Sequence, residues 1–394
     1  MIKSIWIDNF KSLVDFELEF TKFNCLVGLN GSGKSTVLQA LDFLSSLMVG
    51  NMDGWLKKRH WESADINSKL IKKNNIDFKV VLQDRVWGEI VWSGSFNRTK
   101  LNCTQERVDS NGVNILKVED NFCHINQILG DSEFDSGGKL TNKVFPLDLF
   151  TIVFKYQGSI LSQLKEKQTC RQMKALKTSI MYLESLAILS PELLRSRTKT
   201  AQGKLDSGGE KLSAFIHESG KEGKEKLRVK LAEVYEQLEN IETRALRSGW
   251  KQLEITERFG NHKLKSTARH INDGMLRLMA ILTQLESDNE LLLFDEIENG
   301  INPELIEYLI DHLIDAPQQV LVTTHSPMIL NFLEDDVAKE GVIYLYKNNL
   351  GFTRSIKLFA IPSIAKKLEF MGPGEAFVDT DLTRLYQEIE LLNP

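Results

Sequence analysis

The 394-residue sequence contains no apolar stretch that approaches the roughly 20 residues needed to cross a bilayer. Its first ten residues, MIKSIWIDNF, also lack the long apolar segment of a secretory signal peptide. These absences argue against a membrane-spanning or secreted protein. We therefore expect a soluble, cytoplasmic protein.

Cysteine is scarce, and the four cysteines are scattered without the spacing of metal ligands: Cys25, Cys103, Cys123 and Cys170. Cys123 and His124 are adjacent, but no second pair accompanies them, which argues against a zinc site. This sparse cysteine usage is typical of a reducing compartment.

An excess of positive charge is also missing, because the formal net charge is -5. The whole chain therefore has no general attraction for nucleic acid, and DNA contact would need a local basic patch. The clusters Lys57–Arg59 and Lys72–Lys73 are the candidates, although short basic clusters are commonly solvated surface.

A complete phosphate-binding motif, GxxxxGK[ST], is present at Gly28–Ser35. An apolar segment at 23–27 predicts a strand before it, and an apolar segment from Ser35 to about Met48 predicts a helix after it. Glycines let backbone N–H groups converge on an anion, and the helix N-terminus adds partial positive charge. The motif therefore predicts an ATP site built from Asn30, Gly31, Ser32, Gly33, Lys34, Ser35 and Thr36.

Within this loop the side chains have distinct expected roles. Lys34 pairs with the β- and γ-phosphates, and the Ser35 hydroxyl is a ligand for Mg²⁺. Thr36 is placed to contact the α-phosphate.

Two carboxylates follow the apolar residues Leu291–Phe294, so a buried strand is expected at 290–294 that ends at Asp295 and Glu296. Asp295 is a candidate Mg²⁺ ligand because hard cations prefer oxygen. Glu296 is the candidate residue that polarises the attacking water. Glu298 is the alternative base. A histidine, His325, follows the next buried strand, expected at 319–323.

The remaining pattern predicts an α/β chain with both nucleotide motifs in one lobe. Strands are expected at 2–7, 13–20, 77–82, 87–93, 100–108 and 113–119, and a terminal hairpin at 342–346 and 352–357. Residues 160–258 are charged and of helical character. An apolar seam there, formed by Leu227, Leu231, Val234, Leu238 and Ile241, predicts an amphipathic helix.

The order of motifs resembles that of the ABC-type ATPases of the RecF/SMC/OLD group, and most closely their compact AAA-labelled bacterial branch. It runs NFKS, GLNGSGKST, INDGM, LLLFDEIENGINP and TTHSP, and the resemblance covers roughly 1–50 and 265–357. It implies a P-loop ABC ATPase head with a mixed sheet, an antiparallel β subdomain and a helical insert. The expected parts are an N-terminal lobe at 1–159, the insert at 160–262 and a C-terminal lobe at 263–394.

Two segments compete for the ABC signature motif. Asp206–Glu210 is nearer to LSGGQ by letters, but it lies 85 residues before Asp295. Ile271–Met275 opens a segment that leads into the Asp-Glu strand, as the signature does in the family, and we assign the motif there. The Asn and Asp in this segment depart from LSGGQ, which weakens the resemblance.

The resemblance implies a homodimer in which Asn272 and Gly274 of one subunit contact the γ-phosphate bound by the other. It makes His325 a γ-phosphate or water contact and Lys34 part of the catalytic set with Glu296. It places Asn299–Asn302 at the dimer seam and brings Lys11 towards the nucleotide. The family's Q-loop glutamine stays open between Gln83, Gln127 and Gln157.

A separate metal-dependent nuclease domain is not expected, because only 69 residues follow His325. Asp379–Asp381 resembles a metal-binding DxD, but no acidic partner motif accompanies it. The expected activity is hydrolysis of ATP with Mg²⁺ in a nucleotide-driven dimerisation switch. The switch is expected to regulate a separately encoded effector in a bacterial anti-phage system; the alternative is a RecF-like DNA-maintenance ATPase that binds DNA.

Overall fold

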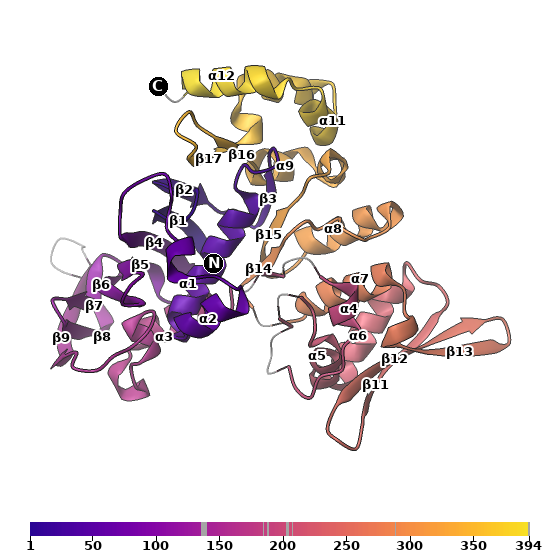
Figure 1. The fold of residues 1–394 in the computed structure, drawn as a ribbon, viewed down its shortest axis with the longest axis horizontal. Helices are drawn as coiled ribbons and strands as arrows, with labels where there is room; N and C mark the ends of the chain where they lie inside the picture. Colours follow the sequence, from indigo (N-terminus) through magenta and orange to yellow (C-terminus); the bar gives the residue numbers. More distant parts are fainter. Residues whose placement is uncertain are drawn as a thin grey trace. The chain divides into compact units, whose positions relative to one another are not determined.

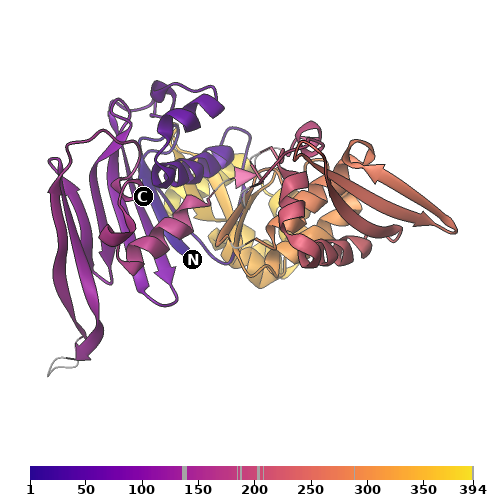
Figure 2. The ribbon, with the colours of Figure 1, turned by 90° about the horizontal axis from the view of Figure 1, so that it is seen from below.

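The computed structural model describes residues 1–134, 140–183, 185–186, 189–201, 205–206, 208–287 and 289–392. The chain divides into two compact units. The first unit contains residues 1–21, 28–183 and 344–356, and the second contains residues 22–27, 184–343 and 357–394. Figures 1 and 2 show the elements of both units.

The first unit is built on an eight-stranded sheet in the order β2-β1-β4-β5-β6-β7-β8-β9, in which neighbouring strands are antiparallel. Its strands are β1 (Ile2–Asp8), β2 (Phe16–Glu19), β4 (Asn75–Asp84), β5 (Gly88–Asn97), β6 (Asn102–Ser110), β7 (Val113–Glu119), β8 (Phe122–Phe134) and β9 (Leu140–Thr151). Its helices are α1 (Lys34–Val49), α2 (Met52–Lys58) and α3 (Arg171–Met181), with short 3₁₀ turns η1 (Ser63–Asp65), η2 (Ile160–Ser162) and η3 (Glu166–Gln168).

Helix α1 packs through an aromatic cluster, which fixes the helix that follows the glycine-rich loop. The ring of Phe43 lies 5.2 Å from that of Phe96 on β5 and 5.3 Å from that of Phe10. All three rings are buried. Aromatic side chains bury large areas, so this cluster anchors α1.

The second unit contains a parallel set of strands in the order β10-β14-β15-β3. These are β3 (Phe23–Val27), β10 (Ser185–Leu186), β14 (Leu291–Phe294) and β15 (Gln319–Thr323). Every residue of β3, β14 and β15 is buried. Continuous apolar runs suit parallel strands that are covered on both faces.

A separate three-stranded antiparallel sheet in this unit has the order β11-β12-β13. It consists of β11 (Leu238–Ala245), β12 (Lys251–Phe259) and β13 (His262–Thr267), and the β12–β13 hairpin is visible as a long ribbon in Figure 2. Helices α5 (Leu212–Glu218) and α6 (Gly220–Ala232) pack against it.

The other helices of the second unit are α4 (Pro191–Leu194), α7 (Asp273–Gln284), α8 (Ile306–Ile314), α9 (Asp335–Gly341), α10 (Pro362–Ala365), α11 (Pro373–Val378) and α12 (Leu382–Leu392). Its 3₁₀ turns are η4 (Ala268–His270), η5 (Pro303–Leu305), η6 (Pro327–Phe332), η7 (Leu358–Ala360) and η8 (Lys366–Glu369). Strands β16 (Val342–Lys347) and β17 (Thr353–Lys357) carry the chain from the second unit into the first and back. No helix among the described residues combines the length and apolar character that crossing a bilayer requires.

The helical seam predicted across 227–241 is wrong beyond residue 232. Leu227 and Leu231 lie on α6, but Leu238 and Ile241 lie on β11. Val234 lies in the turn that follows α6. The expected half-buried strand at 13–20 is also shorter, because β2 covers only Phe16–Glu19.

Candidate nucleotide site

The phosphate loop adopts backbone conformations that glycine favours. Gly28, Gly31 and Gly33 have φ values of 148°, 77° and 115°. A Cβ at Gly33 would lie 2.4 Å from Oγ1 of Thr353, so a side chain there would also collide with a buried neighbour. The positions of these glycines in the motif are therefore required by the backbone.

The start of α1 has the features of an anion site. Gly33 precedes α1 without a side-chain cap, which leaves the first-turn amides without a capping partner from that residue. The Ser32 hydroxyl is buried and has no hydrogen-bond partner among the described residues. Lys34 is 5% exposed, and its Nζ donates to the Gly28 carbonyl at 2.7 Å, so the ammonium lies over the loop.

Thr353 braces this loop from β17. Its hydroxyl donates to the Ser32 carbonyl at 2.9 Å and lies 2.8 Å from the Ser12 hydroxyl. Its backbone N–H donates to the Ser12 carbonyl at 2.9 Å. The serine of NFKS thus supports the loop indirectly, a connection that the sequence did not reveal because 341 residues separate Ser12 from Thr353.

Lys11 lies beside α1. Its Nζ donates to Oε1 of Gln39 at 2.8 Å and sits 3.3 Å from the centre of the Trp61 ring. Burial, followed by the positive charge of Arg59, lowers the pKa of Lys11 to about 8. Lys11 therefore reaches the second turn of the helix after the loop, and its approach to a nucleotide stays a prediction.

One threonine fixes the turn that carries the two carboxylates after β14. Thr323 is fully buried, and its hydroxyl donates to Oδ1 of Asp295 at 2.5 Å. The same hydroxyl accepts from the Glu296 backbone N–H at 2.9 Å. Glu296 has a φ of 48°, a left-handed conformation in which the chain turns away from the strand. Asp295 and Glu296 thus leave the strand with a fixed relation to each other.

His325 lies next to Glu296, whereas Glu298 has another role. Nε2 of His325 is 3.5 Å from Oε1 of Glu296. Oε1 of Glu298 accepts from the backbone N–H groups of His325 and Ser326 at 2.8 and 3.1 Å. Glu298 therefore fixes the loop that carries His325, which favours Glu296 over Glu298 as the base.

The strands of the second unit end together. Phe294 is paired with Val322, and Thr323 is paired with Leu26 in parallel ladders. The carboxyl ends of parallel strands lie at one edge of a sheet, where ligands of α/β folds bind. Asp295 and Thr324 follow two of these ends, and Gly28 follows Val27, the last residue of β3.

Asn272 caps the helix that the sequence assigns to the signature. Its Oδ1 accepts from the backbone N–H of Met275 at 2.7 Å, as a helix N-cap does. Arg277, one turn into α7, donates to the Asn299 carbonyl at 2.5 Å. A Cβ at Gly300 would lie 2.7 Å from this guanidinium, so α7 is tied closely to the turn after Glu298.

The competing segment 206–210 is a turn before α5. Lys211 forms an ion pair of 2.9 Å with Asp206, and the Gly208 carbonyl accepts from the Ser190 N–H at 3.3 Å. Ser207 lies outside the described residues. The short α5 leads into α6, whereas α7 leads into β14, as expected for the signature helix.

The three candidate Q-loop glutamines lie in the first unit. Gln83 lies on β4, and Gln127 lies on β8, where its side chain is outside the described part of the structure. The Gln157 carboxamide bonds to Asp53 at the start of α2, through Nε2 at 2.5 Å and Oε1 at 3.0 Å. The assignment therefore stays open.

The basic clusters proposed for DNA contact are partly neutralised within the fold. Arg59 forms an ion pair with Asp42, and Lys73 pairs with Asp8 and Asp77. Asp379 of the DxD-like segment accepts an ion pair from Lys367 at 3.1 Å. Within the described ranges, no cluster of three or more histidine, cysteine or acidic residues is arranged to hold a metal ion.

Comparison with known families matches two separate segments of the chain. Residues 1–100 match the family described as "AAA ATPase domain". Residues 191–331 match the family described as "AAA domain, putative AbiEii toxin, Type IV TA system". These segments contain the phosphate loop and the Asp-Glu strand respectively.

Two curated proteins show limited sequence similarity. The "DNA double-strand break repair Rad50 ATPase" of Methanococcus maripaludis is 23% identical over 286 residues, which cover 69% of this chain and 25% of that protein. The "Uncharacterized ABC transporter ATP-binding protein YfmR" of Bacillus subtilis (strain 168) is 27% identical over 97 residues, covering 24% of this chain and 15% of that protein. The aligned parts thus span a quarter or less of these relatives.

Among solved structures, the chain is similar to an SMC head bound to the C-winged helix domain of ScpA, with a TM-score of 0.55 and 13% identity. The match covers 91% of this chain and 99% of that one. The recombination mediator RecF has a TM-score of 0.47 and 14% identity, with 90% and 98% covered. The likeness to the SMC head shows the fold. The predicted resemblance and the predicted fold class, a P-loop ABC ATPase head, are confirmed.

Proposed function

We propose that this chain, which carries the ABC-type ATPase head fold of the RecF/SMC-like group, binds ATP with Mg²⁺, hydrolyses it and uses it as a dimerisation switch. The observation that carries the proposal is the phosphate loop: three glycines at positive φ, an uncapped helix start and a buried lysine over the loop. This combination provides backbone N–H groups and one ammonium for an anion.

The residues of the loop fit a triphosphate. Gly33 allows a left-handed backbone at a point where any side chain would collide with Thr353, and the buried Ser32 hydroxyl has no protein partner among the described residues. Asn30 to Thr36 would hold the phosphates, with Lys34 at the β- and γ-phosphates. Ser35 and Asp295 supply the oxygen ligands that Mg²⁺ prefers.

The bound metal would neutralise charge on the phosphates, and the protein's own groups would do the rest. Glu296 is held in a left-handed turn and is one-third exposed, so its carboxylate is able to receive a proton from water. His325 lies beside it and would orient the water or contact the γ-phosphate. Lys34 would stabilise charge that develops at the transferred phosphoryl group.

The proposed dimer interface contains the start of α7 and the turn that follows Glu298. Asn272 and Asn299 are exposed, and Arg277 joins their segments. In the proposed dimer, Asn272 and the Gly274 backbone of one copy cover the γ-phosphate held by the other, with Asn299–Asn302 at the seam. ATP would thus join two heads, and hydrolysis would release them.

The biological role that we propose is regulation of a separately encoded effector in an anti-phage system. The family description "putative AbiEii toxin, Type IV TA system" over residues 191–331 supports this choice. Co-purification of the chain with the product of a neighbouring gene, lost in Lys34→Ala, is the expected result. A chain that confers defence alone would contradict the effector proposal.

A DNA-maintenance role is the second candidate, favoured by the similarity to the Rad50 ATPase named in DNA double-strand break repair. It predicts retention of duplex DNA that requires ATP and weakens as salt rises. Absence of retention at low salt would remove this candidate and leave the ATPase proposal intact.

The ATPase proposal is tested with purified protein. Wild type should bind a fluorescent ATP analogue and release phosphate with Mg²⁺, and Lys34→Ala should lose both. Lys22→Ala is a matched control, because Lys22 is an exposed lysine that precedes β3. Wild type with no nucleotide affinity would contradict the proposal.

A further inference from the structure

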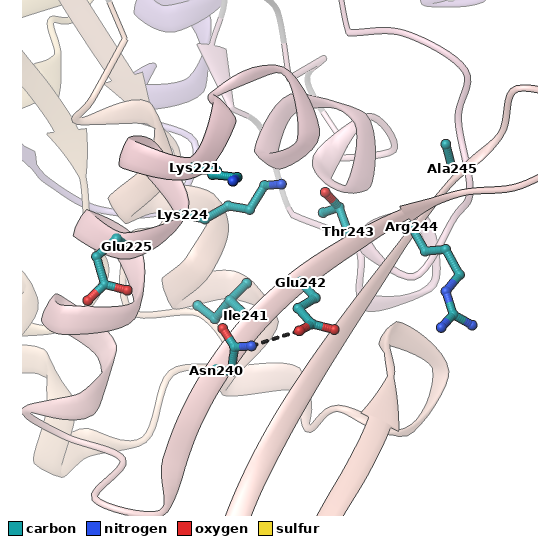
Figure 3. Close-up of a pocket in the computed structure, with 9 residues that line it drawn as sticks. All are labelled: Lys221, Lys224, Glu225, Asn240, Ile241, Glu242, Thr243, Arg244 and Ala245. Atoms are coloured by element: carbon teal, nitrogen blue, oxygen red, sulfur yellow. Dashed lines mark hydrogen bonds between the residues drawn. The ribbon is translucent and has the colours of Figure 1, made fainter.

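A groove of about 570 Å³ lies between helix α6 and strand β11 (Figure 3). Lys221, Lys224 and Glu225 line it from the helix, and residues 240–245 line it from the strand. None of these residues belongs to the nucleotide motifs. The groove therefore has no role in the ATPase chemistry proposed above.

The groove runs along the edge of the strand. Successive side chains of a strand point to opposite faces of a sheet, so a cavity on one face touches alternate residues. This cavity touches six consecutive residues. Among the strands of the described residues, β11 is at the edge of its sheet and pairs only with β12.

The hydrogen-bond register identifies which backbone groups face the groove. In the β11–β12 hairpin, the Leu246 N–H donates to the Trp250 carbonyl, whereas the Lys251 N–H donates away from β11, to Thr198. Hydrogen-bonded and non-hydrogen-bonded pairs alternate along an antiparallel ladder. The pairs at 244–252, 242–254 and 240–256 are therefore hydrogen-bonded within the hairpin.

It follows that the N–H and C=O groups of Ile241, Thr243 and Ala245 point to the open edge. Among the described residues, no hydrogen bond to these backbone groups comes from outside the sheet. An unpaired row of this kind is a template for another strand. Outward-facing backbone groups occur at every second residue along this edge, and an added strand presents its own hydrogen-bonding groups at the same interval.

Basic side chains outnumber acidic ones in the lining of this groove, by three to two. Lys221 and Lys224 extend from α6 beside the strand, and Arg244 extends from the strand itself (Figure 3). Burial, followed by the nearby charges of Lys251 and Lys224, lowers the pKa of His217, whose Nδ1 is 2.8 Å from the Thr243 hydroxyl. Glu225 and Glu242 are the acids of the lining, and Glu242 accepts from Asn240 at 2.8 Å.

We propose that this groove binds an extended acidic segment of a partner protein, which adds to β11 as a fourth strand of the β11-β12-β13 sheet. The backbone of Ile241, Thr243 and Ala245 supplies the ladder. Lys221 and Lys224 select acidic side chains at alternate positions of the segment, on the side that faces α6. The arrangement combines main-chain affinity with charge selection.

The test uses fluorescence anisotropy with a labelled eight-residue peptide of alternating Glu and Thr, capped at both ends. The wild-type chain should bind it, and a peptide of alternating Lys and Thr should not bind. Methylating the backbone nitrogens of the Glu-Thr peptide should abolish binding without any change to the protein. Lys224→Glu should weaken binding about tenfold or more, equal to about 1.4 kcal/mol.

Protein variants separate the ladder from the charge. Ala245→Pro removes one outward N–H on an edge strand, where proline is tolerated, and should weaken binding about tenfold. Lys265→Glu on β13, the opposite edge strand, is the control and should bind as wild type does. Folding of each variant is checked by its thermal unfolding midpoint.

Three outcomes would overturn the proposal. The first is peptide binding that survives backbone methylation, because it would leave only charge attraction. The second is tighter binding of a single-stranded oligonucleotide that depends on Lys224 and not on Ala245. The third is a chain that dimerises through β11 without nucleotide, with Ala245→Pro restoring the monomer, since a second copy would then occupy the edge.

Discussion

Nε2 of His325 lies 3.5 Å from Oε1 of Glu296, although 29 positions separate them in the sequence. Both side chains are partly exposed, at 40% and 33%. They come from the loops after β15 and β14, two adjacent parallel strands. A carboxylate and an imidazole that share solvent access at a strand edge are suited to position one water molecule.

Replacing Glu296 with Gln should abolish ATP hydrolysis and preserve ATP binding, because the amide retains the shape of the side chain and loses the base. With saturating ATP and Mg²⁺ the variant should accumulate as a dimer, measured by light scattering after gel filtration. Glu304→Gln, on the 3₁₀ turn η5, is the control and should hydrolyse ATP normally. A Glu296→Gln chain that binds ATP and stays monomeric would contradict the switch.

Replacing Thr323 with Val should impair the Asp295–Glu296 turn. The change removes the donor to Asp295 and the acceptor for the Glu296 N–H, and leaves a partly buried amide unsatisfied. We expect a loss of about 1–3 kcal/mol in the free energy of unfolding. The Mg²⁺ concentration for half-maximal hydrolysis should also rise.

Thr323→Ser keeps the hydroxyl and is the matched control, expected to retain the Mg²⁺ dependence of wild type. Denaturant unfolding measures the stability, and phosphate release over a Mg²⁺ titration measures the site. Equal Mg²⁺ dependence in the Val and Ser variants would show that the threonine bond has no part in metal binding.

Asn272 combines an observed cap with a proposed contact in the partner subunit, and two substitutions separate these roles. Asn272→Ala should lose the cap and cost about 0.5–2 kcal/mol of stability. Asn272→Asp keeps a good cap but places a negative charge where the proposed dimer holds a phosphate. It should therefore unfold as wild type does and fail to dimerise with ATP when combined with Glu296→Gln.

Asn272→Ser is the control in that background, because serine both caps a helix and is the residue of the family's signature motif. It should be stable and should dimerise. If the Asp variant dimerises as well as the Ser variant, Asn272 acts only as a helix cap.

The candidate site residues could be proposed from sequence because each stands at a fixed place in a continuous motif. Gly28–Ser35 fixes a strand, a loop and a helix within a few residues, and Asp295 follows four buried apolar residues of β14. Helix α1 and strands β3, β7 and β15 were predicted with bounds close to those observed. The local spacing of apolar and polar residues was sufficient to predict these four elements.

Contacts between distant segments could not be predicted. The bond from Thr353 to Ser32 spans 321 positions, and no local pattern marks it. The error at 233–241 has a different origin. The apolar residues from Leu227 to Ile241 follow a helical spacing across the turn after α6. Leu238 and Ile241 nevertheless belong to β11, because pairing with β12 outweighs that local spacing.

Glu106 provides a prediction about stability and pH. It is fully buried on β6, where Oε1 accepts from the indole N–H of Trp92 at 2.8 Å and from the Ser159 hydroxyl. Oε2 accepts from the Ile160 N–H at 2.9 Å. This carboxyl therefore holds the segment after β9 against the sheet of the first unit.

Burial raises the pKa of Glu106, and the three hydrogen bonds oppose the rise without cancelling it. The folded chain therefore binds this proton more tightly than the unfolded chain does. The contribution of Glu106 to the free energy of unfolding should fall as pH rises from its ordinary pKa through the raised one, and should be constant above both.

Replacing Glu106 with Gln should remove this pH dependence. The amide nitrogen cannot accept from the Ile160 N–H or from a second donor, so one buried group loses its partner, at a cost of about 1–3 kcal/mol. Denaturant unfolding at several pH values compares the variant with wild type and with Glu89→Gln, an exposed position on β5. A Glu106→Gln chain whose stability and pH profile match those of wild type would show that this carboxyl does not hold the segment.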